Sequence, residues 1–186
     1  MAQGNKICEI CHTLGHSKFY CKSKPIKPIK RVAIKKTTAK TKKSDRAKAK
    51  KDCWDAFSIY IRTRDCLRFT GDPTQGKCVT CNRLYPITQL QAGHFISGRG
   101  NAVLLDERLV YSQCIGCNGN PPYGKGGNYV EYFRFMLDEV GLEKIDEFRA
   151  LKNTTQVYKT HNFIELKEGF ELKTKELITK YKGLVE

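Results

Sequence analysis

The sequence lacks the long apolar segments found in membrane proteins and secreted precursors. No uninterrupted apolar run approaches the roughly 18 residues that suggest a membrane span, and no apolar segment opens the chain. We therefore expect a soluble protein of a reducing cytoplasm. In that compartment the nine cysteines are better explained as metal ligands than as disulfides.

Acidic residues are nearly missing from residues 22–51, where fourteen Lys or Arg accompany the single acid Asp45. Most of the formal net charge of +15 comes from this tract, which favours a polyanionic partner. A membrane surface is a poor alternative, because most of the tract lacks the apolar face of an interfacial helix. Its composition predicts an extended, self-repelling linker over residues 23–51, although a solvated tail kept for solubility is the competing interpretation. Nucleic-acid contacts are expected at Lys35, Lys36, Lys42 and Lys43.

Two sets of four residues have the spacing of zinc ligands. The first lies in residues 1–22 and resembles a zinc knuckle, a small module used on single-stranded nucleic acid; its ligands are Cys8, Cys11, His16 and Cys21. The second consists of two Cys-x-x-Cys pairs separated by 32 residues, namely Cys78, Cys81, Cys114 and Cys117. Four thiolates saturate a tetrahedral zinc ion and leave no open position for water. We therefore expect two structural zinc ions per chain.

Two cysteines are left over, Cys53 and Cys66. We expect one core position and one loop thiol. Cys66 is also an alternative ligand, should the second set be paired differently.

The remaining patterns predict a zinc-stapled α+β domain over residues 52–186 with a helical C-terminal half. A helix begins near Ser44 and buries Trp54, Phe57 and Ile61. The Cys78 pair tips a short hairpin, and two strands are expected around residues 91–95 and 108–113. Helices follow over residues 129–140, 142–151 and about 162–182, the first capped by Asn128 and Glu131 and stopped at Gly141.

The candidate for catalysis is His94, which follows Gly93 at the expected end of a strand. An imidazole there could take a proton from water at neutral pH. Hydrolysis of a phosphodiester also needs a cation, and Mg²⁺ or Mn²⁺ prefers oxygen ligands. Asn118 and Asn128 are candidate ligands, with a turn and a helix cap as their competing roles. Arg99 and Lys125 could contact phosphate or simply be solvated.

Several motifs in fixed order resemble the phage NinG/Rap recombination endonucleases, which belong to the HNH, or ββα-metal, nucleases. The motifs are Cys78-x-x-Cys81, Ala92-Gly93-His94-Phe95, Asp106-Glu107-Arg108, Gln113-Cys114-x-x-Cys117-Asn118 and Gly127-Asn128. The similarity covers roughly Trp54 to the C-terminus. It implies a ββα-metal core and cutting of branched DNA, including Holliday junctions, in the cytoplasm of a bacterial host.

The resemblance also implies roles for single residues. His94 matches the general base, and Asn118 stands where many HNH proteins place a ligand of the catalytic metal. Three positions depart from the pattern: Gly93 replaces an acidic or histidine ligand, Leu109 an asparagine and Tyr111 a histidine.

These observations predict a divalent-metal-dependent endodeoxyribonuclease in which His94 activates water, while Asn118 or Asn128 helps to hold the ion. The expected partner is branched or partly single-stranded DNA, and the two cuts of junction resolution favour a homodimer. Two other interpretations stay open. One is a catalytically silent, zinc-dependent nucleic-acid-binding protein, and the other is a single-strand or RNA-binding accessory factor.

Overall fold

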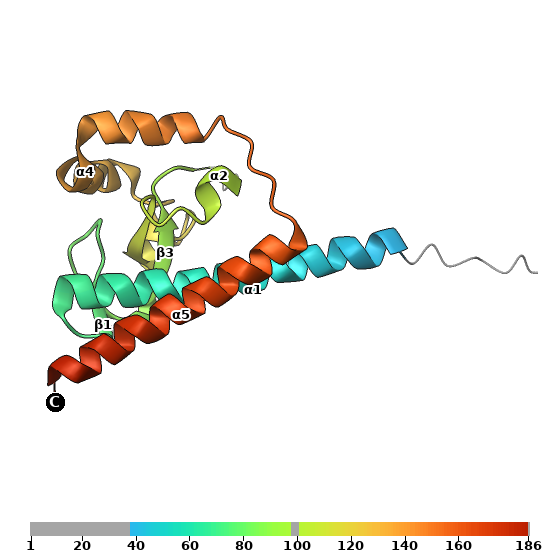
Figure 1. The fold of residues 1–186 in the computed structure, drawn as a ribbon. Helices are drawn as coiled ribbons and strands as arrows, with labels where there is room; N and C mark the ends of the chain where they lie inside the picture. Colours follow the sequence, from blue (N-terminus) through green and yellow to red (C-terminus); the bar gives the residue numbers. More distant parts are fainter. Residues whose placement is uncertain (1–37, 98–100, 186) are drawn as a thin grey trace, which may run out of the picture. The chain divides into compact units, whose positions relative to one another are not determined.

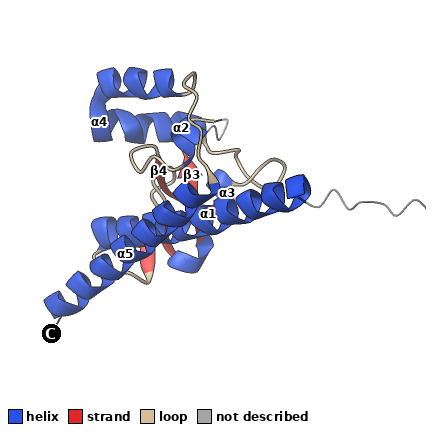
Figure 2. Ribbon diagram, turned by 45° about the vertical axis from the view of Figure 1, so that its right-hand side comes forward, coloured by secondary structure: helices blue, strands red, loops and turns tan. Residues whose placement is uncertain are grey.

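Helices make up most of the described part of the chain, and two small antiparallel sheets lie among them (Figure 1; Figure 2). The computed structural model describes residues 38–97 and 101–185. In chain order the elements are α1 (Thr38–Thr70), β1 (Gln75–Lys77), β2 (Leu84–Pro86), η2 (Ile87–Gln89), β3 (Leu90–His94), α2 (Asn101–Leu104), β4 (Val110–Cys114), α3 (Ile115–Asn118), α4 (Tyr129–Leu151) and α5 (Thr160–Val185). The predicted α+β class with a helical C-terminal half is confirmed.

Helix α1 begins at Thr38, well before the start predicted near Ser44. The prediction of an extended linker is therefore wrong for residues 38–51. These residues include alanine and many lysines, which are good helix formers, and contain neither proline nor glycine. Because helix propagation is much easier than nucleation, the packed part of α1 can extend this helix despite the repulsion between its charges.

The packed part of α1 lies alongside α5, as both ribbon views show (Figure 1; Figure 2). Phe57 and Ile61 are fully buried, and the Phe57 ring lies 4.8 Å from that of Phe170 on α5. The predicted apolar face of α1 is thus confirmed. Among the described residues, none of the helices combines the length and apolar character needed to cross a membrane.

The strands β3 and β4 form a two-stranded antiparallel sheet between α1 and α4 (Figure 1). Leu90 pairs with Cys114 at one end and His94 with Val110 at the other. Tyr132 of α4 is 1% exposed; its hydroxyl accepts from the Tyr111 amide at 2.9 Å and donates to the Gly93 carbonyl at 2.8 Å. The helix therefore joins the two strands through one buried hydroxyl.

On the side of α1, the buried Asp65 performs a similar task. One carboxylate oxygen accepts from the Ser112 amide of β4 at 2.7 Å, and the other accepts from Arg64 at 2.8 Å. Burial raises the pKa of Asp65, although Arg64 and the Ser112 amide both oppose this shift. The strand β4 is thus anchored by hydrogen bonds from the helices on both sides.

The strands β1 and β2 form the second sheet, with Lys77 paired to Leu84. The Cys78–Cys81 turn connects them, and the Cys78 amide donates to the Arg83 carbonyl at 2.9 Å. The predicted hairpin with a cysteine pair at its tip is confirmed.

The N-terminal cap of α4 differs from the prediction, whereas the break in the helix at Gly141 agrees with it. Asn128 is left-handed, with φ of 48°, and its side chain forms no cap hydrogen bond. The predicted capping box is wrong, since Glu131 pairs with Arg134 instead. Gly141 has φ of 81° and separates two helical segments, which confirms the predicted stop there.

We expect Tyr132→Phe to destabilise the protein, because it removes a buried hydroxyl that bonds both strands. The expected loss is about 1–3 kcal/mol in the free energy of unfolding. Urea titration followed by circular dichroism measures it. Tyr129→Phe is the matched control on the same helix, because that hydroxyl bonds Arg149 at the surface; its effect should stay within about 0.5 kcal/mol. Equal effects of the two variants would contradict the bridging role.

Candidate functional site

The four cysteines of the second predicted set come together where the Cys78–Cys81 turn meets the β4–α3 junction. Their sulfur atoms all lie within 4.8 Å of one another, and Cys81 Sγ is 3.9 Å from Cys114 Sγ. Zinc at about 2.3 Å from each sulfur requires sulfur–sulfur distances of about 3.8 Å in a tetrahedron. The predicted grouping is confirmed, and the cluster could bind a metal such as zinc.

Polar groups lie next to two of these sulfurs. The Thr80 hydroxyl lies 3.3 Å from Cys78 Sγ, and Asn128 Nδ2 donates to Cys117 Sγ at 3.7 Å. Burial tends to raise the pKa of Cys78, but Thr80 and nearby backbone amides outweigh burial and lower it to about 7. Such outer hydrogen bonds orient the ligands of a metal site.

The two remaining cysteines are both buried in α1. Cys53 belongs to the main core, as expected, and burial raises its pKa to about 11. Cys66 packs beneath the four-cysteine cluster and is neither a loop thiol nor a member of the ligand group. Burial raises its pKa to about 11 as well, which is typical of an unreactive core thiol.

His94 is partly buried at the end of β3. Its ring stacks on Trp54 of α1, with centroids 5.0 Å apart and planes 16° from parallel. Nε2 lies 3.0 Å from the Leu104 carbonyl of α2, so in the neutral ring Nε2 carries the proton and Nδ1 is the basic nitrogen. Trp54 was expected only as a core residue, because helical spacing alone does not reveal its contact with His94.

Asn118 lies on the other side of β3 from His94. Its Nδ2 donates to Gln91 Oε1 at 2.8 Å. Side chains alternate between the two faces of a strand, so Gln91 and His94 point to opposite faces. At about 3.3 Å per residue, their positions are also about 10 Å apart along the strand. The Asn118 amide thus contacts β3 at Gln91, three residues before His94 and on the opposite face of the strand.

Asn118 and Asn128, the alternative candidate ligands of Mg²⁺ or Mn²⁺, both form contacts through their amide nitrogens. Asn118 contacts Gln91, and Asn128 turns its amide nitrogen to Cys117. In the part of the chain that is described, the four cysteines are the only group of three or more Cys, His, Asp or Glu that could share an ion.

The predicted basic contacts are scattered or outside the described residues. Lys125 is exposed in the loop before α4, and Lys42 and Lys43 lie on α1. The predicted residues outside the described part are Cys8, Cys11, His16, Cys21, Lys35, Lys36 and Arg99.

Packing explains why glycine occupies position 93. A Cβ there would collide with Gln113 Oε1 and lie 2.8 Å from Gln113 Cδ. Gln113 is fully buried, and its Nε2 donates to the Gly127 carbonyl at 2.7 Å and to the Thr80 hydroxyl at 3.2 Å. The acidic ligand expected by analogy therefore has no room beside this glutamine.

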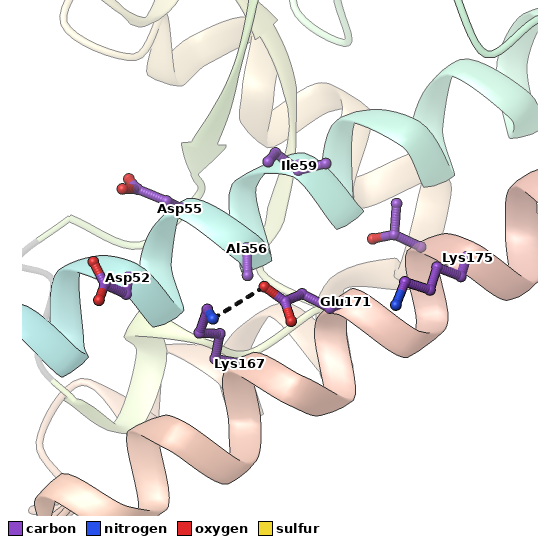
Figure 3. A pocket seen from close by; sticks show the side chains of 8 residues that line it. Asp52, Asp55, Ala56, Ile59, Lys167, Glu171 and Lys175 are labelled. Carbon is purple, nitrogen blue, oxygen red and sulfur yellow. Dashed lines mark ion pairs between the residues drawn. The ribbon is translucent and has the colours of Figure 1, made fainter.

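A groove of about 630 Å³ lies on the surface along the line where α1 and α5 pack together (Figure 3). Asp52 and Asp55 line it from α1, while Lys167 and Glu171 of α5 form an ion pair at 3.2 Å. Both charge signs are present, and none of the predicted site residues borders the groove. It offers no selective attraction for a polyanion.

Fold and site together define a helix-rich α+β protein assembled around a four-cysteine cluster suited to zinc. Among known families, the one described as Bacteriophage Lambda NinG protein matches residues 3–180. The chain belongs to the NinG family. No solved structure is significantly similar to it.

The relatives include proteins ninG of three phages. The protein of Salmonella phage P22 is 26% identical over 128 residues, which are 68% of this chain and 56% of the relative. Those of Escherichia phages 933W and lambda are 29% and 28% identical over 104 residues, 55% of this chain and 45% of each relative. The chain spans about half the length of the curated relatives it matches. The family match also includes the N-terminal cysteines, so the expected restriction of the resemblance to residues after Trp54 is wrong.

Cys114→Ser should lower the zinc content of the full chain by one ion, from two to one, because a serine hydroxyl is a poor replacement for a thiolate. Mass spectrometry of the metal after dialysis measures this content. Cys66→Ala is the matched control, since this thiol is buried beside the cluster but lies outside the ligand group. Loss of zinc from the control would mean that the ligand set is wrong.

Gly93→Ala should cost about 1–3 kcal/mol of stability, because the new methyl group collides with Gln113. In a Gln113→Ala background the same change should cost at least about 1 kcal/mol less. Urea unfolding of the wild type, both single variants and the double variant gives this coupling. Additive effects would show that Gln113 does not impose glycine at this position.

Proposed function

We propose that this protein is a zinc-stabilised endonuclease that cuts branched DNA of the Holliday-junction type during phage recombination. The observation that carries the proposal is the placement of His94 at the end of the first of two strands that lead into the cysteine-bearing helix α3. This order of elements resembles the ββα unit of HNH nucleases. The family membership supports the phage context.

The histidine has features suited to a general base. The contact with the Leu104 carbonyl selects the tautomer, and the Trp54 ring holds the plane of the imidazole. As the base, the imidazole of His94 would take a proton from the attacking water. A general base of this kind contributes about 10²–10⁴-fold to a rate.

Dependence on Mg²⁺ or Mn²⁺ belongs to the proposal but has no ligand set in the described residues. A hard cation would supply charge neutralisation at the phosphate. Asn118 and Asn128 use their amide nitrogens in the contacts with Gln91 and Cys117. The zinc cluster contributes structure alone, since four thiolates leave no position for water.

A second candidate function is nucleic-acid binding without cleavage. Two observations favour it: Gln113 excludes an acidic ligand at Gly93, and Asn128 contacts a cluster sulfur instead of facing a substrate. In this alternative the histidine is a packing residue that joins α1, β3 and α2.

His94→Ala and His94→Gln should lower cleavage by about 100-fold or more, because neither side chain can accept the proton. The assay follows labelled four-way junction, duplex and single-stranded DNA with Mg²⁺, with Mn²⁺ and without either ion. We expect cutting of the junction above all, and only with a divalent ion.

His161→Ala is the control, because this histidine is exposed on α5. It should cut like the wild type. Circular dichroism of each variant separates a lost base from a lost fold. If the wild type binds all three DNAs but cuts none, the binding function replaces the nuclease.

A further inference from the structure

Among the described residues, the loop between α3 and α4 displays the most exposed large apolar side chain. Tyr123 is 93% exposed. No described residue stacks on its ring or hydrogen-bonds to its hydroxyl. By contrast, Tyr132 of α4 is buried, and its hydroxyl forms two hydrogen bonds. A tyrosine ring offers a large, flat apolar surface with a polar hydroxyl, which suits it to cover part of a binding partner.

The loop that carries Tyr123 is braced at its base. The Gly126 amide donates to the Gly119 carbonyl at 2.8 Å, and the Gly127 amide donates to the Cys117 carbonyl at 2.9 Å. Gly124 lies so close to Gly119 that a Cβ would collide with the Gly119 carbonyl oxygen. The two ends of the loop are therefore held close together directly after Asn118, and one end is hydrogen-bonded to the backbone of Cys117.

The tip of the loop has little freedom to withdraw its aromatic ring. The Gly124 amide donates to the Asn120 carbonyl at 3.0 Å and closes a turn over the tip. Pro121 and Pro122 occupy this turn immediately before Tyr123, and proline restricts the backbone. The ring is therefore exposed on a turn whose backbone is already ordered. Binding of a partner there would cost little additional loop entropy.

The chemistry around the ring suits a nucleobase. Lys125, two residues further on, is exposed and supplies a positive charge for a phosphate, and its own amide is fixed to the Gly116 carbonyl at 3.1 Å. Proteins that bind single strands combine aromatic rings, on which bases stack, with cations along the backbone. A base paired within a duplex has no free face for such a ring.

We infer that Tyr123 is a stacking platform for an unpaired base beside the branch of a DNA substrate, with Lys125 on the adjoining phosphate. This inference rests on the proposed function and names the feature of the substrate that the protein recognises. The contact is made by the loop that follows Asn118, and His94 belongs to a different element, β3. It therefore acts on binding and selectivity and takes no part in proton transfer.

The test measures equilibrium binding by the full chain to a splayed-arm DNA without added Mg²⁺ or Mn²⁺. Abasic sites replace, one at a time, the first three unpaired positions of each arm. For the wild type, removal of one particular base should weaken binding by about 5- to 100-fold. Tyr123→Ala should weaken binding to the intact DNA by a similar factor and abolish the preference for a base at that position.

Tyr123→Phe should bind within about twofold of the wild type, because the stacking face is kept. Lys125→Ala should weaken binding while retaining the preference for the base. Val157→Ala is the control at another exposed apolar side chain and should change nothing. For blunt duplex DNA, Tyr123→Ala and the wild type should bind alike.

The inference is overturned if no abasic position couples to Tyr123, if the alanine variant loses duplex binding equally, or if the wild type binds none of these DNAs. Stacking and cleavage can fail separately. Coupling at one position without any cutting of junctions would retain the platform and reject the nuclease. Cutting that depends on His94, without coupling to Tyr123, would do the opposite.

Discussion

The four-cysteine cluster is the constraint on which the rest of the structure depends. Each sheet has only two strands, and those of β1 and β2 are three residues long. Such hairpins are marginal on their own in water. A metal bound by the Cys78–Cys81 turn and by the end of β4 would tie both hairpins together and contribute its binding free energy to folding. The loop that leads to α4 is fastened to the same cluster through Cys117.

Around that constraint, the β3–β4 sheet separates two sets of polar side chains. His94 belongs to the face covered by α1, where Trp54 stacks on it. Gln91 belongs to the other face, where it contacts Asn118. One strand thus carries a proton-transfer candidate on one side and an amide cluster on the other.

The family relation and the geometry contribute different information. The match over residues 3–180 assigns the chain to the NinG family and covers the N-terminal cysteines. It does not identify the reacting groups. The local contacts place the His94 ring against Trp54, the Asn118 amide against Gln91 and the Asn128 amide against Cys117. The exposed Tyr123 lies outside the motifs that carry the family resemblance.

Residue spacing was sufficient to predict features that depend on local chemistry. Two Cys-x-x-Cys pairs predicted the thiol cluster, glycine at position 141 predicted the break in α4, and the period of Phe57 and Ile61 predicted the buried face of α1. Each follows from bond geometry or from the pitch of a helix. Tertiary packing decided the rest. The collision of Gln113 with any side chain at Gly93, the turning of Asn128 toward Cys117 and the stacking of Trp54 on His94 join residues far apart in sequence, and no spacing rule encodes such contacts. Packing also decided the helical state of residues 38–51. Repulsion between their positive charges opposes the start of a helix within this segment, but the packed part of α1 is already helical and the helix extends from it.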